Sequence, residues 1–208
     1  MIGHFRGDNM KNVLITGINS DFDNCLAKKF MAEGYDVFIL EDGKTLGVEK
    51  LDFFIDTTDY VHENDGSSVR EGVNWDAVEA TFRNNPLKSM ALLEAHLPLL
   101  DAGEEKRLFY LTQSRASINE TESTTGYGYN MSKTALHMFI HLSRNKLAPL
   151  GYTFRVFDPL TGIVDAKAAA ESAFTYITRR RGTDGDDGLR DDEDNLVIWD
   201  ALGRKHSW

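Results

Sequence analysis

The sequence has little of what marks secreted or membrane-embedded proteins. It contains one cysteine, Cys25, which cannot form an internal disulfide, so a reducing cytoplasm is the expected location. No apolar run approaches the roughly 18 residues needed to span a bilayer. Residues 1–9 are polar and lack the apolar core of a signal peptide.

Basic residues are also scarce. The 208 residues include 23 Lys and Arg against 33 Asp and Glu, for a net charge of −10. Such a balance argues against nucleic acid or an anionic membrane as a partner. A hydrophobic content of 41% is ordinary for a globular chain, and the length predicts a single domain over residues 10–208 after an unstructured extension at 1–9.

Short apolar runs alternate with helical patterns along the whole chain. This alternation predicts a doubly wound, mostly parallel α/β sheet of the Rossmann type, with about six strands and helices on both faces. Pro86 is expected to break the second helical pattern or to start a new helix. The predicted strands are 13–15, 36–40, 51–55, 107–112, 153–157 and 196–199, and the predicted helices are 22–33, 75–100, 129–147 and 166–181.

The stretch 11–33 organises the predicted fold. It reads as a strand, then a polar turn after Thr16-Gly17, then an amphipathic helix. The N-terminus of a helix attracts anions, because its first N–H groups are unpaired and its dipole is positive there. If the chain binds a nucleotide, the phosphates should lie at this turn.

Tyr129 and Lys133 lie four residues apart in a predicted helix, and therefore on one face of it. An ammonium near a phenol favours the phenolate and lowers its pKa, which suits proton transfer at neutral pH. A surface pair with no role is the alternative for this spacing alone. Ser114 strengthens the functional interpretation, because it follows a buried-type strand, where ligands bind in open α/β sheets.

Several segments in order resemble the short-chain dehydrogenase/reductase family. Thr16-Gly17 resembles the start of the family's TGxxxGxG turn, and the pattern from Tyr129 to Lys133 matches YxxSK. The segments LDFFIDTT at 51–58, FRNNPL at 82–87 and the tail 203–208 resemble further family motifs, so the resemblance runs from residue 10 to residue 208.

The resemblance implies catalytic roles. Tyr129 would be the general acid/base on a carbonyl or alcohol, and Lys133 would lower its pKa and bind the nicotinamide ribose. Ser114 would bind the substrate oxygen, with Ser117 as a competing candidate. Asn85 would support a water-mediated proton relay.

The resemblance also implies NAD as cofactor, with Glu41 as the acidic residue that binds the ribose hydroxyls. It further implies a homodimer or homotetramer, through pairing of the helices at 87–100 and 129–147. The residues that it places at the cofactor are Gly17, Ser20, Asp21, Phe22, Glu41, Thr57 and Lys133.

Four departures from the family pattern affect the cofactor side. Asp21 and Asp23 stand where the turn has its second and third glycines, and both could instead cap the helix. The segment 56–59 replaces NNAG, and only residues 41–50 separate the second and third strands, which leaves little to hold an adenine. The sixth-strand PG is Pro159-Leu160, followed by a short substrate loop.

Two functions therefore remain open. The first is an oxidoreductase that moves a hydride between NAD(H) and a small carbonyl or alcohol. The second is a non-catalytic binding or scaffold protein that keeps the fold without the dinucleotide. Proton-transfer chemistry without a nicotinamide is a third possibility.

Other candidate sites are weaker. His137 and His141 have a spacing that suits zinc, but no third ligand is in view, so we expect helix-surface or interface histidines. The acidic segment 182–195 does not match the EF-hand register and is expected to be a solvated loop. Cys25 is expected in the core, and no metal site is predicted.

Overall fold

The centre of the protein is a seven-stranded sheet with the order β2-β1-β3-β4-β5-β6-β7. The computed structural model describes residues 10–40, 46–179 and 196–208. All pairs are parallel except β6 with β7, so the predicted doubly wound fold is confirmed, with one strand more than the six expected. The strands are β1(Asn12–Ile15), β2(Asp36–Ile39), β3(Phe53–Asp56), β4(Arg107–Leu111), β5(Thr153–Asp158), β6(Ile198–Asp200) and β7(Lys205–His206).

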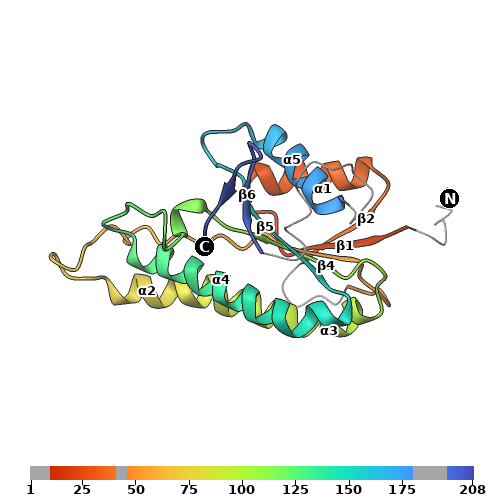
Figure 1. Cartoon of the computed structure of the whole chain (residues 1–208), viewed down its shortest axis with the longest axis horizontal. Helices are drawn as coiled ribbons and strands as arrows, with labels where there is room; N and C mark the ends of the chain where they lie inside the picture. Colours follow the sequence, from red (N-terminus) through yellow and green to blue (C-terminus); the bar gives the residue numbers. More distant parts are fainter. Residues whose placement is uncertain (1–9, 41–45, 180–195) are drawn as a thin grey trace.

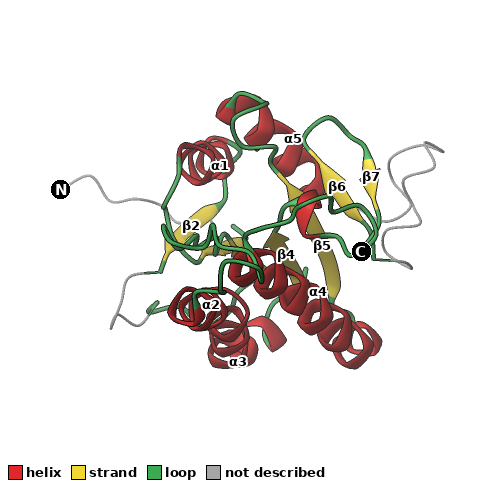
Figure 2. Ribbon diagram, turned by 90° about the vertical axis from the view of Figure 1, so that its left-hand side faces the viewer, coloured by secondary structure: helices red, strands yellow, loops and turns green. Residues whose placement is uncertain are grey.

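Helices cover both faces of the sheet (Figures 1 and 2). One face carries α1(Asp21–Ala32) and α5(Ala166–Thr178), which pack on each other. The other face carries α2(Trp75–Phe82), α3(Lys88–Asp101) and α4(Tyr127–Leu147).

Side-chain alternation along the strands builds a separate core on each face. Val13 and Ile15 of β1 point into the core under α1 and α5, whereas Leu14 between them points into the core under α3 and α4. Phe54 joins Leu14, and Ile55 joins Val13. Because both faces are covered, the central strands are apolar at almost every position, as buried parallel strands require.

The second helical pattern is interrupted at Pro86, as predicted. A π-helical turn, η1(Arg83–Leu87), separates α2 from α3. Proline has no N–H to donate and crowds the preceding turn, so the backbone widens there. The wider turn places Asn85 in the interior, with no exposed surface.

Some predictions lie outside the described residues: the extension at 1–9, Glu41, and the acidic segment 182–195. Within the described part of the chain, no helix is both long and apolar enough to cross a membrane. Pairing of copies through α3 and α4 stays a prediction. The exposed apolar side chains on these helices include Met90, Met138 and Leu142.

Close packing of α4 on α2 supplies a test of this arrangement. A Cβ at Gly128 would lie 2.6 Å from Thr81 Oγ1 and 3.0 Å from Val78 Cα. We expect Gly128→Ala to lower the free energy of unfolding by about 1–2 kcal/mol, since overpacking outweighs the gain in helix propensity. Gly66→Ala, with no atom within 4 Å of the added Cβ, is the control. Equal urea midpoints for the two variants would contradict the close approach.

Candidate functional site

The candidate site lies where the carboxyl ends of β3 and β4 meet the N-terminus of α4. Asp65 fixes this N-terminus, because its carboxylate accepts hydrogen bonds from Gly128 N at 2.9 Å and Tyr129 N at 2.7 Å. The residue before the helix is Gly126, which has no side chain to cap it. Asp65 therefore takes the capping role from a distant loop, and sequence reasoning missed it because N-cap residues are sought beside the helix.

Lys133 is fully buried, and its ammonium has three acceptors. Nζ lies 2.7 Å from Thr58 O, 3.4 Å from Leu111 O and 2.9 Å from Asp59 Oδ1. An ammonium has three N–H groups, so these contacts use all of them. The predicted proximity of Lys133 to Tyr129 is present, with Nζ 5.8 Å from the centre of the phenol ring.

Tyr129 is also buried, with 2% of its surface exposed, and its hydroxyl donates to Asp59 Oδ1 at 2.7 Å. Burial first, and then the Asp59 carboxylate, raise the pKa of Tyr129 well above 10. The prediction that Lys133 lowers this pKa is therefore wrong. A neighbouring anion and the loss of water both oppose the phenolate, and together they outweigh the nearby cations.

Asp59 joins the two residues into one cluster, which we call the Tyr129–Asp59–Lys133 cluster. Its side chain is 27% exposed. Burial raises its pKa, but the charge of Lys133 and the hydrogen bonds from Tyr129 and Lys133 outweigh this, so the pKa falls below its usual 3.8. Sequence reasoning placed Asp59 only among the departures from the family pattern. The available signal was its place three residues after a buried strand.

Asn85 holds the loop that carries Asp59. Its Oδ1 accepts from Tyr60 N at 2.8 Å, and its Nδ2 donates to Tyr60 O at 2.9 Å and to Ser132 Oγ at 2.9 Å. The amide thus binds both backbone groups of the residue directly after Asp59. In this conformation Asn85 fixes the position of the loop that carries Asp59.

The two candidate serines lie in different surroundings. Ser114 opens the short turn η2(Ser114–Ala116) after β4; it is half-buried, and its backbone N–H donates to Asp158 Oδ2 at 2.6 Å. Ser117 has no exposed surface, and its Oγ accepts from Asn119 N at 3.2 Å. Gln113 and Arg115 flank Ser114 and reach the cluster, with Gln113 Nε2 3.4 Å from Asp59 Oδ2 and the Arg115 guanidinium 4.8 Å above the Tyr129 ring. Ser114 thus lies between two residues that contact the cluster, and the choice between the two serines stays a prediction.

The turn at the start of α1 is closed by its own side chains. Ser20 is the N-cap and accepts from Asp23 N at 3.2 Å, while the Asp23 carboxylate accepts from Asn19 N at 2.9 Å. Asp23 is 1% exposed, and burial raises its pKa above 3.8. The predicted capping role is confirmed for Asp23, whereas Asp21 is exposed in the first turn.

The remaining residues predicted at the cofactor have structural contacts. Thr57 Oγ1 donates to Gly17 O at 3.0 Å and so ties the end of β3 to the turn after β1. Phe22 is 5% exposed and stacks on Phe157 in the core under α1. Cys25 was expected in the core, and it is partly buried against the same core as Phe22.

His137 differs from its prediction as a surface or interface residue. It is 4% exposed, and its Nε2 lies 2.5 Å from Thr112 Oγ1. His141 is exposed. No group of three or more metal-binding side chains occurs among the described residues, which leaves the two histidines without a third ligand.

Solved structures with this architecture are known. The chain superposes on a putative short-chain alcohol dehydrogenase from Burkholderia multivorans with a TM-score of 0.74 at 14% identity, covering 96% of this chain and 100% of that one. The carbonyl reductase Sniffer of D. melanogaster gives 0.72 at 14% identity, and a carbonyl reductase from Pseudomonas aeruginosa PAO1 in complex with NADP gives 0.70 at 15%, both with the same coverage. No protein-family model matches the sequence, and no curated protein matches it.

The chain has the short-chain dehydrogenase/reductase fold. Within that fold, Tyr129 and Lys133 lie together at the carboxyl edge of the sheet, and Asn85 lies beside the same loop. At these identities the likeness concerns the fold alone.

A short-chain dehydrogenase/reductase fold implies a nicotinamide dinucleotide, and the residues of this chain do not fit one in the observed conformation. At the turn, the Asn19 N–H that an anion would need is bound by the Asp23 carboxylate. At the carboxyl ends of β3 and β4, the Asp59 carboxylate is bonded to both the Tyr129 hydroxyl and Lys133 Nζ. Both contact points of the cofactor are thus filled by carboxylates, which carry the same sign of charge as a phosphate.

The pairing of Lys133 with Asp59 should contribute to stability. We expect Asp59→Asn to lower the free energy of unfolding by about 3 kcal/mol, because it leaves a fully buried ammonium without its counter-charge. Urea unfolding at neutral pH would measure the loss. Glu94→Gln, at an exposed position on α3, is the control and should change little.

The same pairing predicts a pH dependence. Because the pKa of Asp59 is lower in the folded state, its contribution is complete above the unfolded pKa of about 3.9 and is lost as pH falls through the folded value. The difference between the wild type and Asp59→Asn should therefore shrink below pH 3.8. A difference that stays constant down to that range and beyond would contradict the ionised pair.

Proposed function

We propose that this chain is a non-catalytic binding protein built on the short-chain dehydrogenase/reductase fold, and that it works without a nicotinamide dinucleotide. One observation carries the proposal. Asp59 Oδ1 lies 2.7 Å from the Tyr129 hydroxyl and 2.9 Å from Lys133 Nζ, so an internal carboxylate takes both groups that would position a cofactor and a substrate.

The turn before α1 supports the same proposal. A carboxylate about 4 Å from a phosphate costs on the order of 1 to 4 kcal/mol, depending on the local dielectric. This corresponds to a loss of affinity of about tenfold to a thousandfold. Asp23 would have to give up its hydrogen bond from Asn19 as well, and its own side chain is buried in the first turn of α1.

A second candidate is a short-chain dehydrogenase/reductase-type oxidoreductase that acts on a small carbonyl or alcohol with NAD. Its support is the placement of Tyr129 beside Lys133, with the half-buried Ser114 close by. It requires Asp59 to leave the cluster when a cofactor enters. The Pseudomonas aeruginosa carbonyl reductase with the same fold has been solved in complex with NADP.

Calorimetric titration with NADH separates the two functions. We expect no heat of binding at millimolar NADH for the wild type. Binding in the micromolar range would overturn the proposal and favour the oxidoreductase.

Two glycine substitutions then test the cause. Asp23→Gly should tighten NADH binding by about tenfold or more, because it frees Asn19 N and removes a buried charge. Asp21→Gly removes an equal charge from an exposed position in the same turn and should have a smaller effect. Equal affinities for the two variants would reject Asp23 as the excluding residue.

Turnover supplies the last test. The wild type should not oxidise NADH in the presence of small aldehydes and ketones. If turnover is seen, Tyr129→Phe should abolish it, and a Tyr129→Phe variant with unchanged turnover would remove Tyr129 from the mechanism.

A further inference from the structure

His206 joins two segments that lie 86 positions apart in the sequence. It belongs to β7, and each of its two ring nitrogens meets a carboxylate. Nδ1 lies 2.8 Å from Glu120 Oε2, in the loop at 117–126 between η2 and α4, and Nε2 lies 2.9 Å from Asp200 Oδ2 of β6. The other cation of β7, Lys205, lies over the Trp199 ring instead.

This geometry requires a positively charged imidazole. An ionised carboxylate can only accept hydrogen bonds, so each ring nitrogen must carry a proton to bond its partner. A neutral imidazole has one N–H and one lone pair, and the lone pair would face an anion at hydrogen-bond distance. The positions of Glu120 and Asp200 therefore fix His206 as an imidazolium in the observed conformation.

The three groups also stabilise one another's charges. Partial burial lowers the pKa of His206, but its hydrogen bonds to Asp200 and Glu120 outweigh burial and raise it above 6.5. Burial raises the pKa of Asp200, but the bonds from His206 and Arg204 outweigh burial and hold it below 3.8. Hydrogen bonds from Ser207 N and then from His206 hold the pKa of Glu120 below 4.5. All three are thus charged from pH 4.5 up to the titration of His206.

The two carboxylates are held with different strength. Asp200 has no exposed side-chain surface, and it also accepts from Arg204 Nε at 2.6 Å and from Arg204 N at 2.9 Å. Glu120 has 37% of its side chain exposed, and its partners in the described structure are His206 and Ser207 N. Glu120 is therefore the partner that leaves when His206 loses a proton, because it can turn into water while Asp200 stays bonded.

The departure of Glu120 loosens the last residues of β7 and those that follow it. Ser207 N donates to Glu120 Oε1, and the adjacent Asn119 Nδ2 donates to Trp208 O at 2.9 Å. Both bonds depend on the present position of the loop, so they weaken together.

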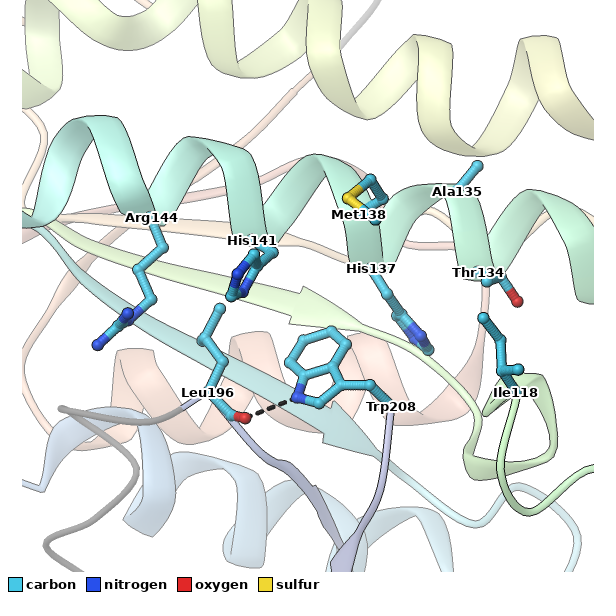
Figure 3. Close-up of a pocket in the computed structure, with 9 residues that line it drawn as sticks. All are labelled: Ile118, Thr134, Ala135, His137, Met138, His141, Arg144, Leu196 and Trp208. Carbon is cyan, nitrogen blue, oxygen red and sulfur yellow. Dashed lines mark hydrogen bonds between the residues drawn. The ribbon is translucent and has the colours of Figure 1, made fainter.

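Trp208 is the residue through which this loosening reaches the interior. Its indole covers the buried His137 of α4 edge to face, with 5.0 Å between ring centres, and its Nε1 donates to Leu196 O at 2.6 Å (Figure 3). A change in the order of Trp208 therefore changes the covering of α4.

We propose that His206 is a pH-sensitive clasp, which fastens residues 205–208 to the loop at 117–126 while it is protonated and frees them when it loses its proton. Because the pKa of His206 is raised in the folded state, the clasp is complete below the unfolded value of about 6.5 and is lost as pH rises through the folded value.

The clasp affects a segment that borders the candidate site. The loop at 117–126 continues directly from η2, where the Arg115 guanidinium lies 4.8 Å above the Tyr129 ring. The clasp is nevertheless independent of the proposed function, because it uses none of the residues that decide whether a dinucleotide binds.

Nitrogen NMR of the imidazole tests the charge. In the wild type, the His206 ring should be mostly protonated at pH 6.5, with both nitrogens carrying a proton, and should titrate above this pH. His206→Gln identifies the signal by its loss. A ring that titrates at or below 6.5 would overturn the proposal.

Solvent exchange of the Trp208 indole N–H tests the release. This proton is bonded to Leu196 O, so it exchanges when residues 205–208 open. After correction for the intrinsic pH dependence of exchange, its protection should fall about threefold to tenfold as His206 loses its proton, as expected for a partly exposed ion pair. Protection that stays constant through the titration would reject the release.

Two glutamate substitutions then link the charge to the release. Glu120→Gln removes one of the two negative charges, so the pKa of His206 should fall, and the pH midpoint of the Trp208 transition should fall with it. Glu122→Gln, at an exposed position two residues farther along the same loop, is the control and should move neither. Glu120 is itself exposed, so this test stands even if His206→Gln fails to fold. A midpoint that stays in place while the pKa of His206 moves would overturn the clasp.

Discussion

The burial of one ammonium group determines how the functional edge of the sheet is built. A charge removed from water must be paired and fully hydrogen-bonded, and Lys133 obtains its acceptors from the loop after β3 and from the end of β4. These contacts tie α4 to two strands at a single point. Tyr129, one turn before Lys133, and Asn85, which holds the same loop, are placed as a consequence.

Features with short-range causes could be predicted from the sequence. The strands followed from apolar runs, the break in the second helix from Pro86, and a capping role for Asp23 from its place in the first turn of the helix. The Tyr129 and Lys133 pair followed from helical spacing. Each of these depends on neighbours within about one turn of the chain.

The partners of these residues could not be predicted, because they come from distant segments. Asp59 reaches Tyr129 from 70 positions earlier in the chain, so the sign of the pKa shift of Tyr129 depended on tertiary contacts that no local pattern records. His137 was expected at a surface for a similar reason. Its burial depends on Trp208, which packs on it from the end of the described chain.

Two aspartates at the same edge of the sheet show how surroundings decide the charge of a group. Asp23 has only neutral donors near its carboxylate, so burial prevails and its pKa rises. Asp59 has also lost part of its contact with water, which raises its pKa, but it faces the ammonium of Lys133, and its pKa falls. One edge therefore carries a carboxylate held as an anion and another biased toward protonation, although the two residues are chemically identical.

The two-residue strand β7 also affects how the molecule behaves among other molecules. A parallel sheet that ended at β6 would offer a row of unpaired backbone groups to the edge of another chain. Instead β7 runs antiparallel and pairs with β6 at Ile198 and Trp199, and its Lys205 extends its ammonium over the Trp199 ring. A strand this short, with a charged side chain at the rim, is a poor template for a further strand. This edge of the sheet is thereby protected against the edge-to-edge association that leads to aggregation.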